Sequence, residues 1–399
     1  MKKNYTFIIL IYLISFHGFC QDCLERSLSD DIICAGQNAS IIVSSSEITM
    51  TYQLRIGTTD IGSPITGTGS DITFTVSPSG TTIYSVFATS NTASICDITY
   101  SDVSTVTVNT LSVAPTTISG TTTICNGQST SLTVSGGTLG TGAVAEWFSV
   151  SCGGTPIGTG NSITVFPTAN TTYYVRYNGT CNSTTCDSVM ITVDQLPTAT
   201  AGGIQTICSN ATATVSGASA TNGTILWTKN GAGSITSGAT TLTPTYTPTA
   251  ADAGNTVTLT MTVTSTNACA PQTATATYSV IVNPLPTATA GGTQTICSNA
   301  TATVSGANAT YGSILWTENG AGSITAGSTT LTPTYSANAA DAGKTITLTM
   351  KVTSTNACAP QTATATYTVI VNPLPTAAAG GSKTICSNAT ATVSGASAT

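Results

Sequence analysis

An internal repeat is the feature that most restricts how this chain can fold. The string ICSNATATVSGA begins at Ile207, Ile296 and Ile385, so the period is 89 residues. Repetition at such a period indicates one domain copied along the chain. The string NPLPTA joins successive copies, and its prolines make the connector short and stiff.

One segment of the repeat indicates its secondary structure. NTVTLTMTVTST at residues 255–266 returns as KTITLTMKVTST at residues 344–355. Side chains alternate across a β-strand, so every second residue shares a face. We therefore expect one face to be buried and the threonine face to meet water. The expected buried residues are Val257, Leu259, Met261 and Val263.

The remaining segments of each copy also favour strands. Alternating segments are separated by Gly, Asn and Pro turns, and no segment keeps a helical apolar period. About seven short strands in roughly 90 residues, with an early aromatic residue, is typical of an immunoglobulin-like sandwich. The predicted fold class is all-β, a tandem array of immunoglobulin-like β-sandwich domains joined by short Pro-containing linkers. The expected core aromatics are Tyr52, Trp147, Trp227 and Trp316.

The first half of the chain contains a second pair of related domains. Cys34 precedes Gly67 of GTGSDITF by the same interval at which Cys125 precedes Gly158 of GTGNSITVF. The expected organisation is a signal peptide at 1–20, immunoglobulin-like domains at 21–110 and 111–195, repeats at 196–284 and 285–373, and the truncated start of a further repeat at 374–399.

The N-terminus has the layout of a secretory signal peptide. Lys2 and Lys3 precede the apolar run FIILIYLISF, and Gly18 and Cys20 supply small residues before the expected cleavage after Cys20. A lipid-anchored Cys20 is the alternative, against which the bulky Phe19 counts. No later apolar run is long enough to span a bilayer, so we expect a secreted or cell-surface protein without a transmembrane segment.

Composition excludes several kinds of function. Cleavage removes Lys2, Lys3 and His17, which is the only histidine, and leaves seven basic against fifteen acidic residues. Catalytic triads and metal sites that need an imidazole are therefore excluded. An acidic chain without a basic cluster also lacks the surface that neutralises phosphates, so no nucleic-acid partner is expected.

Twelve cysteines remain after cleavage, and in an oxidising compartment they predict structural disulfides. Nearly the same separation between two cysteines recurs in each domain, which suggests one long loop closed within each of them. Cys23 is left without an assigned partner, and Cys386 is expected to pair beyond Thr399. The predicted pairs are Cys34–Cys96, Cys125–Cys186, Cys208–Cys269 and Cys297–Cys358, with Cys152–Cys181 as an additional pair in the second domain.

Two stretches resemble modules of bacterial surface proteins. WFSVSCGGTPIGTGNSITVFPTANTTYYVRYNGTCNSTTC, residues 147–186, resembles the immunoglobulin-like domains of large surface proteins of gliding and related bacteria of the Bacteroidetes type. NPLPTATAGGTQTICSNATATVSGA and TPTYSANAADAGKTITLTMKVTST are similar to the polycystic-kidney-disease-like (PKD-like) repeats of the same proteins. The resemblance implies a cell-surface location and, by analogy, type IX secretion.

The carboxylates do not indicate an enzyme. Between residues 196 and 399 the acidic residues are Asp252, Glu318 and Asp341. The third domain alone cannot supply the two facing carboxylates of a glycosidase, and its near-copy is therefore not expected to do so. One carboxylate per ADAG string also falls short of a calcium site, so we expect a turn or capping role. No catalytic residue, cofactor or metal site is predicted.

Three functional hypotheses remain, with polysaccharide or another extracellular ligand as the expected partner. The first is a surface stalk or adhesin whose repetition adds avidity. The second is a non-catalytic spacer or carbohydrate-binding region of a larger secreted enzyme. The third is a module that binds polysaccharide through exposed aromatics such as Tyr311, although the other copy has Asn222 there. Threonine on the exposed face of the strands keeps that face soluble, which is sufficient to explain it. Binding to glycans and matching of an ice lattice are the alternative functions of this face. The near-identity of the copies favours the stalk.

Overall fold

A computed structural model describes residues 24–92 and 97–399, which consist almost entirely of β-strands and the turns between them. It divides into two compact units, Met1–Val193 and Asp194–Thr399. The predicted signal peptide, Cys23 and Cys96 lie outside the described residues. Within the residues that the structure describes, no helix is long and apolar enough to cross a membrane.

Unit 1 begins with a two-layered sandwich. Its strands are β1 (Asp31–Cys34), β2 (Ala39–Val43), β3 (Met50–Ile56), β4 (Thr59–Thr66), β5 (Ile72–Val76), β6 (Thr82–Ser90), β7 (Ile98–Thr99) and β8 (Ser104–Asn109). One sheet has the order β1-β8-β6-β3-β4, with β7 beside β6, and the other pairs β2 with β5. Alternate residues of β2 and β5 are buried, and Ile41, Tyr52 and Val86 lie in the core between the sheets.

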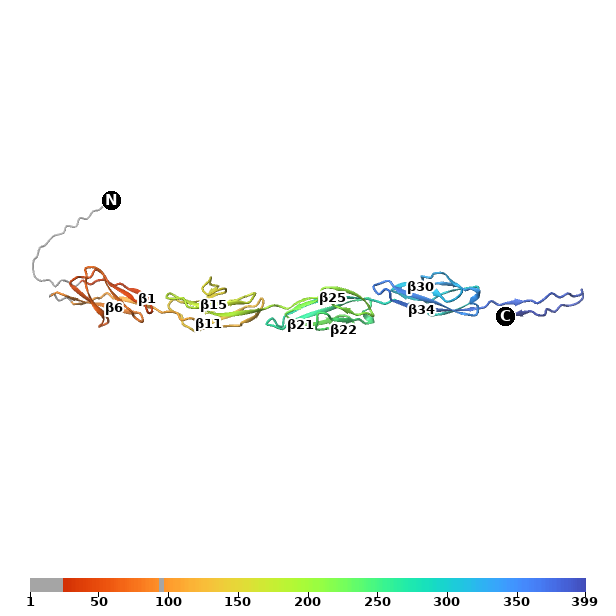
Figure 1. Ribbon diagram of the computed structural model, residues 1–399, viewed down its shortest axis with the longest axis horizontal. Coiled ribbons are helices and arrows are strands. Elements are labelled where there is room, and N and C mark those ends of the chain that lie inside the picture. Colours follow the sequence, from red (N-terminus) through yellow and green to blue (C-terminus); the bar gives the residue numbers. More distant parts are fainter. Residues whose placement is uncertain (1–23, 93–96) are drawn as a thin grey trace, which may run out of the picture. The chain divides into compact units, whose positions relative to one another are not determined.

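The second sandwich of unit 1 has its own core. Its strands are β9 (Thr117–Ser119), β10 (Thr123–Cys125), β11 (Thr130–Ser135), β12 (Val144–Phe148), β13 (Gly158–Thr159), β14 (Ser162–Val165), β15 (Thr171–Asn178) and β16 (Asp187–Asp194). The sheets have the orders β10-β16-β15-β12-β13 and β14-β11-β9. Leu132 of β11 and Val175 of β15 share one core with Trp147, and Figure 1 shows these two strands on opposite sides of the sandwich.

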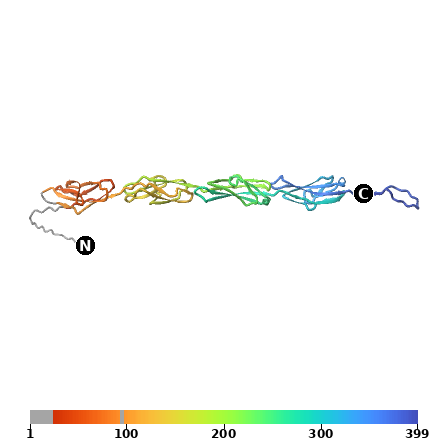
Figure 2. The same ribbon diagram turned by 90° about the horizontal axis from the view of Figure 1, so that it is seen from below.

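Unit 2 contains two sandwiches with the same strand order. In the first the strands are β17 (Thr198–Thr200), β18 (Ile204–Cys208), β19 (Ala213–Thr214), β20 (Ser219–Thr221), β21 (Gly223–Lys229), β22 (Ser234–Ser237), β23 (Thr245–Thr247), β24 (Thr256–Ser265) and β25 (Thr273–Asn283), with the 3-10 turn η1 (Ala250–Asp252). The sheets are β18-β25-β24-β21 and β19-β23-β22, and β17 pairs with β20. Figure 2 shows this sandwich, in green, from below.

The second sandwich of unit 2 repeats this plan. Its elements are β26 (Thr287–Thr289), β27 (Thr293–Cys297), β28 (Thr301–Thr303), β29 (Asn308–Thr310), β30 (Gly312–Glu318), β31 (Ser323–Ala326), β32 (Thr334–Ser336), η2 (Ala339–Asp341), β33 (Thr345–Ser354) and β34 (Thr362–Asn372). The sheets are β27-β34-β33-β30 and β28-β32-β31, with β26 beside β29. A final hairpin pairs β35 (Ala377–Ala378) with β36 (Ser397–Ala398).

The alternation predicted for the threonine-rich strands is confirmed. Val257 in β24 is 2 % exposed, and Leu259, Met261 and Val263 are completely buried, while the intervening threonines are partly or fully exposed. β33 has the same pattern. The predicted aromatic core residues are also buried. Trp147, Trp227 and Trp316 each donate an indole N–H to a backbone carbonyl, so burial leaves no unpaired donor on these rings.

The protein is therefore all-β, with immunoglobulin-like β-sandwiches that follow one another in the sequence and short connectors that contain proline, such as Pro284 and Pro286. Parallel pairs at the sheet edges decide where several cysteines lie. β1 runs parallel to β8, β18 to β25 and β27 to β34. The expected domain boundaries stay a prediction.

Candidate functional site

The cystines of unit 1 differ from the predicted pairs. Cys34, at the end of β1, is bonded to Cys181 in the loop between β15 and β16, with a Cα–Cα distance of 5.6 Å. The pair Cys34–Cys96 is therefore wrong, and so is Cys152–Cys181. The bond joins a strand of the first core to a loop of the second, instead of closing one domain.

A second correction concerns the additional cysteine of the second sandwich. Cys152 is bonded to Cys186 with a Cα–Cα distance of 6.0 Å. The predicted pair Cys125–Cys186 is therefore also wrong, although Cys125 is itself disulfide-bonded. The loop that the bond between Cys152 and Cys186 closes lies within one sandwich.

In unit 2 a cystine again joins the two sandwiches. Cys208 at the end of β18 is bonded to Cys358, which lies 150 residues later between β33 and β34. The predicted pairs Cys208–Cys269 and Cys297–Cys358 are therefore wrong. Cys269 is disulfide-bonded, whereas Cys297 and Cys386 are free and exposed.

The strand topology explains why a pair within one repeat is excluded. β18 runs parallel to β25, so that Cys208 lies opposite Asn283, the last residue of β25. Cys269 precedes the first residue of the same strand, Thr273. The whole of β25 extends roughly 30 Å at about 3.3 Å per residue. A disulfide joins Cα atoms no more than about 7 Å apart, so Cys208 and Cys269 lie too far apart, at opposite ends.

The same argument applies to the fourth domain. Cys297 ends β27 and lies opposite Asn372, the last residue of β34, while Cys358 precedes that strand. In each folded repeat, the first cysteine of the sequence therefore lies at the end of the sandwich where the chain leaves it, and the second lies at the opposite end, where the chain enters. The equal spacing of the cysteines reflects the identity of the copies and not a loop closed by a bond.

Polar contacts surround the cystine between the two sandwiches of unit 2. Sγ of Cys358 lies 3.6 Å from the carbonyl oxygen of Asn283, and Sγ of Cys208 lies 3.8 Å from that of Ala357. The Asn356 side chain donates to the carbonyl of Pro284 at 3.0 Å and accepts from the backbone N–H of Cys358 at 2.8 Å. We call the turn Asn356–Cys358 the docking turn of this repeat.

Unit 1 builds its junction with the same chemistry. Asn182 donates its side-chain amide to the carbonyl of Ser112 at 2.9 Å and accepts from the Ser112 N–H at 2.8 Å. Next to it, Sγ of Cys181 lies 3.7 Å from the carbonyl oxygen of Asn109, the residue paired with Cys34. A cysteine near an asparagine therefore docks onto the end of the preceding sandwich in both units.

A turn in the first sandwich of unit 2 repeats the docking contacts. Asn267 donates to the carbonyl of Gln195 at 3.1 Å, and Sγ of Cys269 lies 3.4 Å from the carbonyl oxygen of Asp194. The Asp194 side chain also accepts from the N–H of Ala268 at 2.9 Å. The string NAC thus has the same kind of polar partner in both repeats, namely backbone carbonyls in the connector that precedes its own sandwich.

The repeated carboxylates of the ADAG strings are buried, with Asp252 3 % exposed and Asp341 fully enclosed. Both oxygens of Asp252 accept hydrogen bonds. Oδ1 accepts from the N–H of Ala232 at 2.7 Å, and Oδ2 accepts at 2.9 Å from the N–H groups of Gly233 and Thr249 and from the Tyr246 hydroxyl. N–H and O–H donors stabilise an anion, and these contacts provide a turn and capping role of the kind that the sequence predicts.

The hydrogen bonds decide how Asp252 titrates. Burial raises its pKa, but the donors of Thr249, Ala232, Tyr246 and Gly233 outweigh burial and lower the pKa to about 2. The pKa of Asp341 is lowered because the same kinds of donor outweigh its burial. Burial, and then the hydrogen bond to the carboxylate, raises the pKa of Tyr246 to about 12. Asp252 is therefore ionised and Tyr246 neutral at ordinary pH.

Sequence reasoning missed the tyrosines and glycines that hold these carboxylates. A Cβ on Gly233 would lie 2.2 Å from the carbonyl oxygen of Thr247, so only glycine brings its N–H close enough to Asp252. A signal was present in the sequence, because the strings NGAGSI and TYT or TYS precede the aspartate at the same intervals in both copies.

The exposed aromatic candidate does not form a shared binding site. Tyr311 is 55 % exposed and has φ 58°, at the turn between β29 and β30. Asn222 occupies the same turn with φ 59° and donates its side-chain amide to the carbonyl of Leu196 at 3.0 Å. The position is one of left-handed backbone geometry, which asparagine adopts more readily than tyrosine.

A regular polar surface covers one side of the first sandwich of unit 2. It consists of paired hydroxyls on β24 and β25, with the exposed Leu226 of β21 beside them. In the fourth domain Lys351 replaces the central threonine of β33. We define the threonine face by the pairs Thr260–Thr277, Thr262–Thr275 and Thr264–Thr273.

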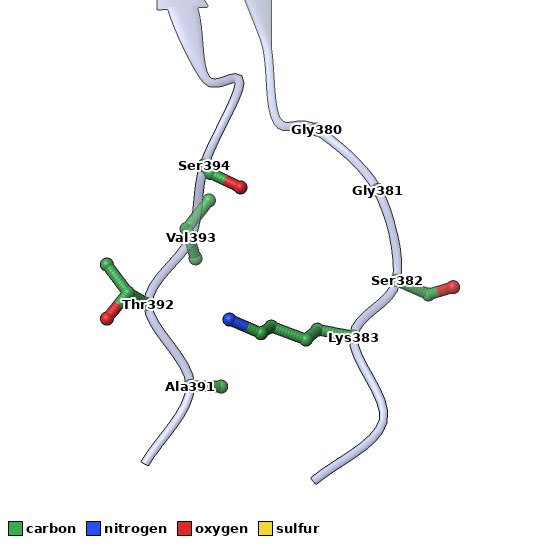
Figure 3. Close-up of a pocket in the computed structure, with 8 residues that line it drawn as sticks. All are labelled: Gly380, Gly381, Ser382, Lys383, Ala391, Thr392, Val393 and Ser394. Carbon is green, nitrogen blue, oxygen red and sulfur yellow. The ribbon is translucent and has the colours of Figure 1, made fainter.

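A hollow of about 300 Å³ lies between the two arms of the final hairpin, beyond its short strands, and is lined by residues 380–383 and 391–394. Figure 3 shows the Lys383 side chain extended across it toward the opposite arm. Val393 is 70 % exposed, whereas its counterparts Val215 and Val304 are completely buried in their sandwiches. The hollow is thus the uncovered interior side of a hairpin and not a pocket shaped for a ligand.

Comparison with known proteins finds immunoglobulin-like domains. Residues 113–194 match the family model described as "Ig-like domain CHU_C associated". No curated protein matches the chain. Similar solved structures include an I-band fragment of titin, with 10 % identity over 65 % of this chain and 97 % of that chain and a TM-score of 0.43. Sidekick-1 immunoglobulin domains 1–4 share 12 % identity over 88 % and 98 %, with a TM-score of 0.27. Drosophila N-cadherin EC1-4 shares 13 % over 86 % and 99 %, with a TM-score of 0.31.

Proposed function

We propose that this protein is an extracellular cell-surface protein. It forms a stalk of immunoglobulin-like domains in which disulfides join neighbouring domains, and it contributes to weak multivalent adhesion. The observation that carries the proposal is the cystine Cys208–Cys358, which joins two successive sandwiches. Cys34–Cys181 does the same in unit 1. If the cystines served only to stabilise folding, bonds within each domain would be sufficient. Bonds between successive domains also link those domains covalently.

The bond changes how tension would pass through unit 2. Force applied to the ends of the chain travels along β18 to Cys208, crosses the cystine to Cys358 and leaves through β34. The residues between the two cysteines, which include most of both cores, are outside that path. A surface tether benefits from this arrangement because unfolding under load cannot lengthen it greatly.

The surface chemistry supports the adhesive part of the proposal. The threonine face offers rows of hydroxyls with few charges, a chemistry that matches neutral polysaccharides through many weak hydrogen bonds. The fourth domain carries a second face of the same kind, interrupted by Lys351. Repetition then raises avidity although each contact is weak. The proposal gives the described residues no catalytic role.

The location is proposed from three independent features. The N-terminal sequence has the layout of a signal peptide, and the cystines need an oxidising compartment. The similarity of residues 113–194 to a CHU_C-associated domain accords with the Bacteroidetes-type surface proteins that the sequence resembles. We extend the proposal to export by the type IX route and association with the gliding cell surface.

Force spectroscopy on the full chain tests the stalk. Pulling from both ends should release little length per unit while the cystines are intact. After reduction, unfolding should release on the order of 500 Å more from the 150-residue loop of Cys208–Cys358. Cys208→Ser should give the longer release without reductant, and Cys297→Ser should not. Equal release in oxidised and reduced chains would contradict the proposal.

Adhesion is tested separately, with the chain either free or clustered on beads and passed over films of dextran, cellulose or alginate. Clustered protein should be retained more than tenfold better than free protein, because avidity multiplies weak contacts. Replacing Thr260, Thr262 and Thr264 by lysine should reduce retention on neutral films. Retention that is the same on bare supports, or unchanged in the variant, would remove the adhesive role.

A further inference from the structure

Cys297 occupies the same structural position as a cysteine that is bonded in the preceding repeat. Cys208 ends β18 opposite Asn283, and Cys297 ends β27 opposite Asn372. The carbonyl of Asn283 accepts from the N–H of Ser209 at 2.9 Å, and that of Asn372 accepts from the N–H of Ser298 at 3.0 Å. The two strand ends therefore present the same groups in the same register.

The surroundings of Cys297 are uncovered where those of Cys208 are covered. Asn283 and Pro284 are partly buried and contact the docking turn of the fourth domain, while their counterparts Asn372 and Pro373 are exposed. Cys297 itself is exposed and its thiol is free, whereas Cys208 is partly buried and bonded. An exposed thiol and an exposed connector thus coincide at one end of this sandwich.

We propose that Cys297, together with the carbonyl groups of Asn372 and Pro373, is a covalent docking site for the NAC turn of a further copy of the 89-residue repeat. The asparagine of that turn donates its side-chain amide to the carbonyl of Pro373, as Asn356 does to Pro284. Its cysteine then lies against the carbonyl of Asn372 and within bonding reach of Cys297, as Cys358 does at Asn283.

The bond forms by thiol–disulfide exchange. The Cys297 thiolate attacks a small-molecule disulfide such as oxidised glutathione and releases one thiol, and the cysteine of the incoming turn then displaces the second. In total, the two protein thiols lose two protons and two electrons, and one glutathione disulfide becomes two glutathione thiols. The inference goes beyond surface adhesion, because it concerns how repeats are linked in whatever location the protein serves.

The sequence around the site also indicates the occupant. Cys386 belongs to the third ICSNATATVSGA string, so it holds the Cys297 position of the next copy and not the NAC position. It is therefore expected to accept a turn and not to supply one. The NAC turns of the third and fourth domains already have partners in their own connectors, because Asn267 binds Gln195 and Asn356 binds Pro284. An additional copy supplies a turn of matching chemistry to Cys297.

An extended chain tests the site. Residues 1–373 are followed by a second copy of residues 285–373 in place of 374–399, and the protein is folded in a glutathione redox buffer. Non-reducing peptide mapping should find Cys297 joined to the copy's counterpart of Cys358, with Cys208–Cys358 retained. Alkylation of Cys297 should fall at least tenfold. Changing the copy's counterpart of Cys358 to serine should restore the alkylation of Cys297.

A second extended chain carries residues 196–284 as the added copy. It keeps the test decisive if the first added copy does not fold. Tryptophan fluorescence of the added domain reports its folding in each case. Cys297 that stays fully alkylatable beside a folded copy, or that bonds to the other cysteine of that copy, overturns the proposal. Neither result bears on adhesion, which is measured on the chain without an added copy, where the Cys297 thiol is free.

Discussion

At the residue scale, the buried aspartates show how a charge is kept in a small β-sandwich. Asp252 exchanges water for backbone N–H groups from two turns and for the Tyr246 hydroxyl. Sequence reasoning placed the carboxylate in a turn but missed the distant donors, since NGAGSI and the tyrosine are brought to it only when β22 pairs with β23. Composition alone says nothing about such a contact.

Acid should weaken unit 2 through these carboxylates. The pKa of Asp252 is about 2 in the fold against 3.8 for the ordinary side chain, a difference worth roughly 2 kcal/mol. A lowered pKa stabilises the fold above about pH 4, and the stabilisation is lost as the pH falls through about 2. Asp341 acts in the same direction. Thermal unfolding of the full chain between pH 6 and pH 2 measures this.

Asp252→Asn combined with Asp341→Asn is the matched control for the acid effect. These amides cannot accept all the donors, so the variant should be less stable at neutral pH and lose less stability in acid. A wild-type melting temperature that stays constant from pH 5 to pH 2 would show that the carboxylates do not carry this stability.

Tyr311→Asn should stabilise the fourth domain by about 1 kcal/mol. Tyr311 has φ 58°, which costs an ordinary residue about 1 kcal/mol or more, and asparagine at the same turn of the other copy gains a hydrogen bond to Leu196. The reciprocal change Asn222→Tyr should destabilise the third domain by a similar amount. Urea denaturation followed by tryptophan fluorescence compares the two, and a loss of stability in Tyr311→Asn would contradict the argument.

At the scale of elements, sequence patterns predicted the strands better than their connections. The alternation in β24 and β33 depends only on neighbours along the chain, so the buried residues were predicted correctly. The cysteine pairs depend on which strand lies beside β18. Parallel pairing with β25 puts Cys208 at the far end from Cys269, and no local pattern contains that information. Partners in another domain were therefore missed.

The docking turn should contribute measurably to the junction in unit 2. Asn356→Ala removes the bond to Pro284 and leaves the N–H of Cys358 without its side-chain acceptor, so the fourth domain should lose about 2 kcal/mol. Lys351→Thr, which restores the residue of the other copy on an exposed face, is the control and should change stability by less than about 0.5 kcal/mol. Urea denaturation measures both, and equal effects would exclude a special role for the turn.

At the scale of the whole molecule, the cystines couple the stability of successive sandwiches within each unit. Closing the 150-residue loop of Cys208–Cys358 is worth about 5 kcal/mol by chain entropy, and the loop includes most of both cores of unit 2. A bond within one repeat would stabilise that repeat alone. Bonds between repeats make neighbouring cores unfold together, and this distinguishes the observed pairing from the predicted one.

Cys208→Ser and Cys358→Ser should therefore each lower the melting temperatures of both the third and the fourth domain, and the two variants should do so by similar amounts. The observed pairing predicts that Cys297→Ser changes neither domain, because its thiol is free. Pairing within repeats would instead make Cys297→Ser as damaging as Cys358→Ser and would confine the effect of Cys208→Ser to the third domain. Calorimetry of the oxidised chains, with Trp227→Phe and Trp316→Phe variants to assign each transition by fluorescence, separates these outcomes. Because Cys208 and Cys297 are equivalent residues of near-identical copies, any difference between them reports the bond to the next domain and not the local environment of the cysteine.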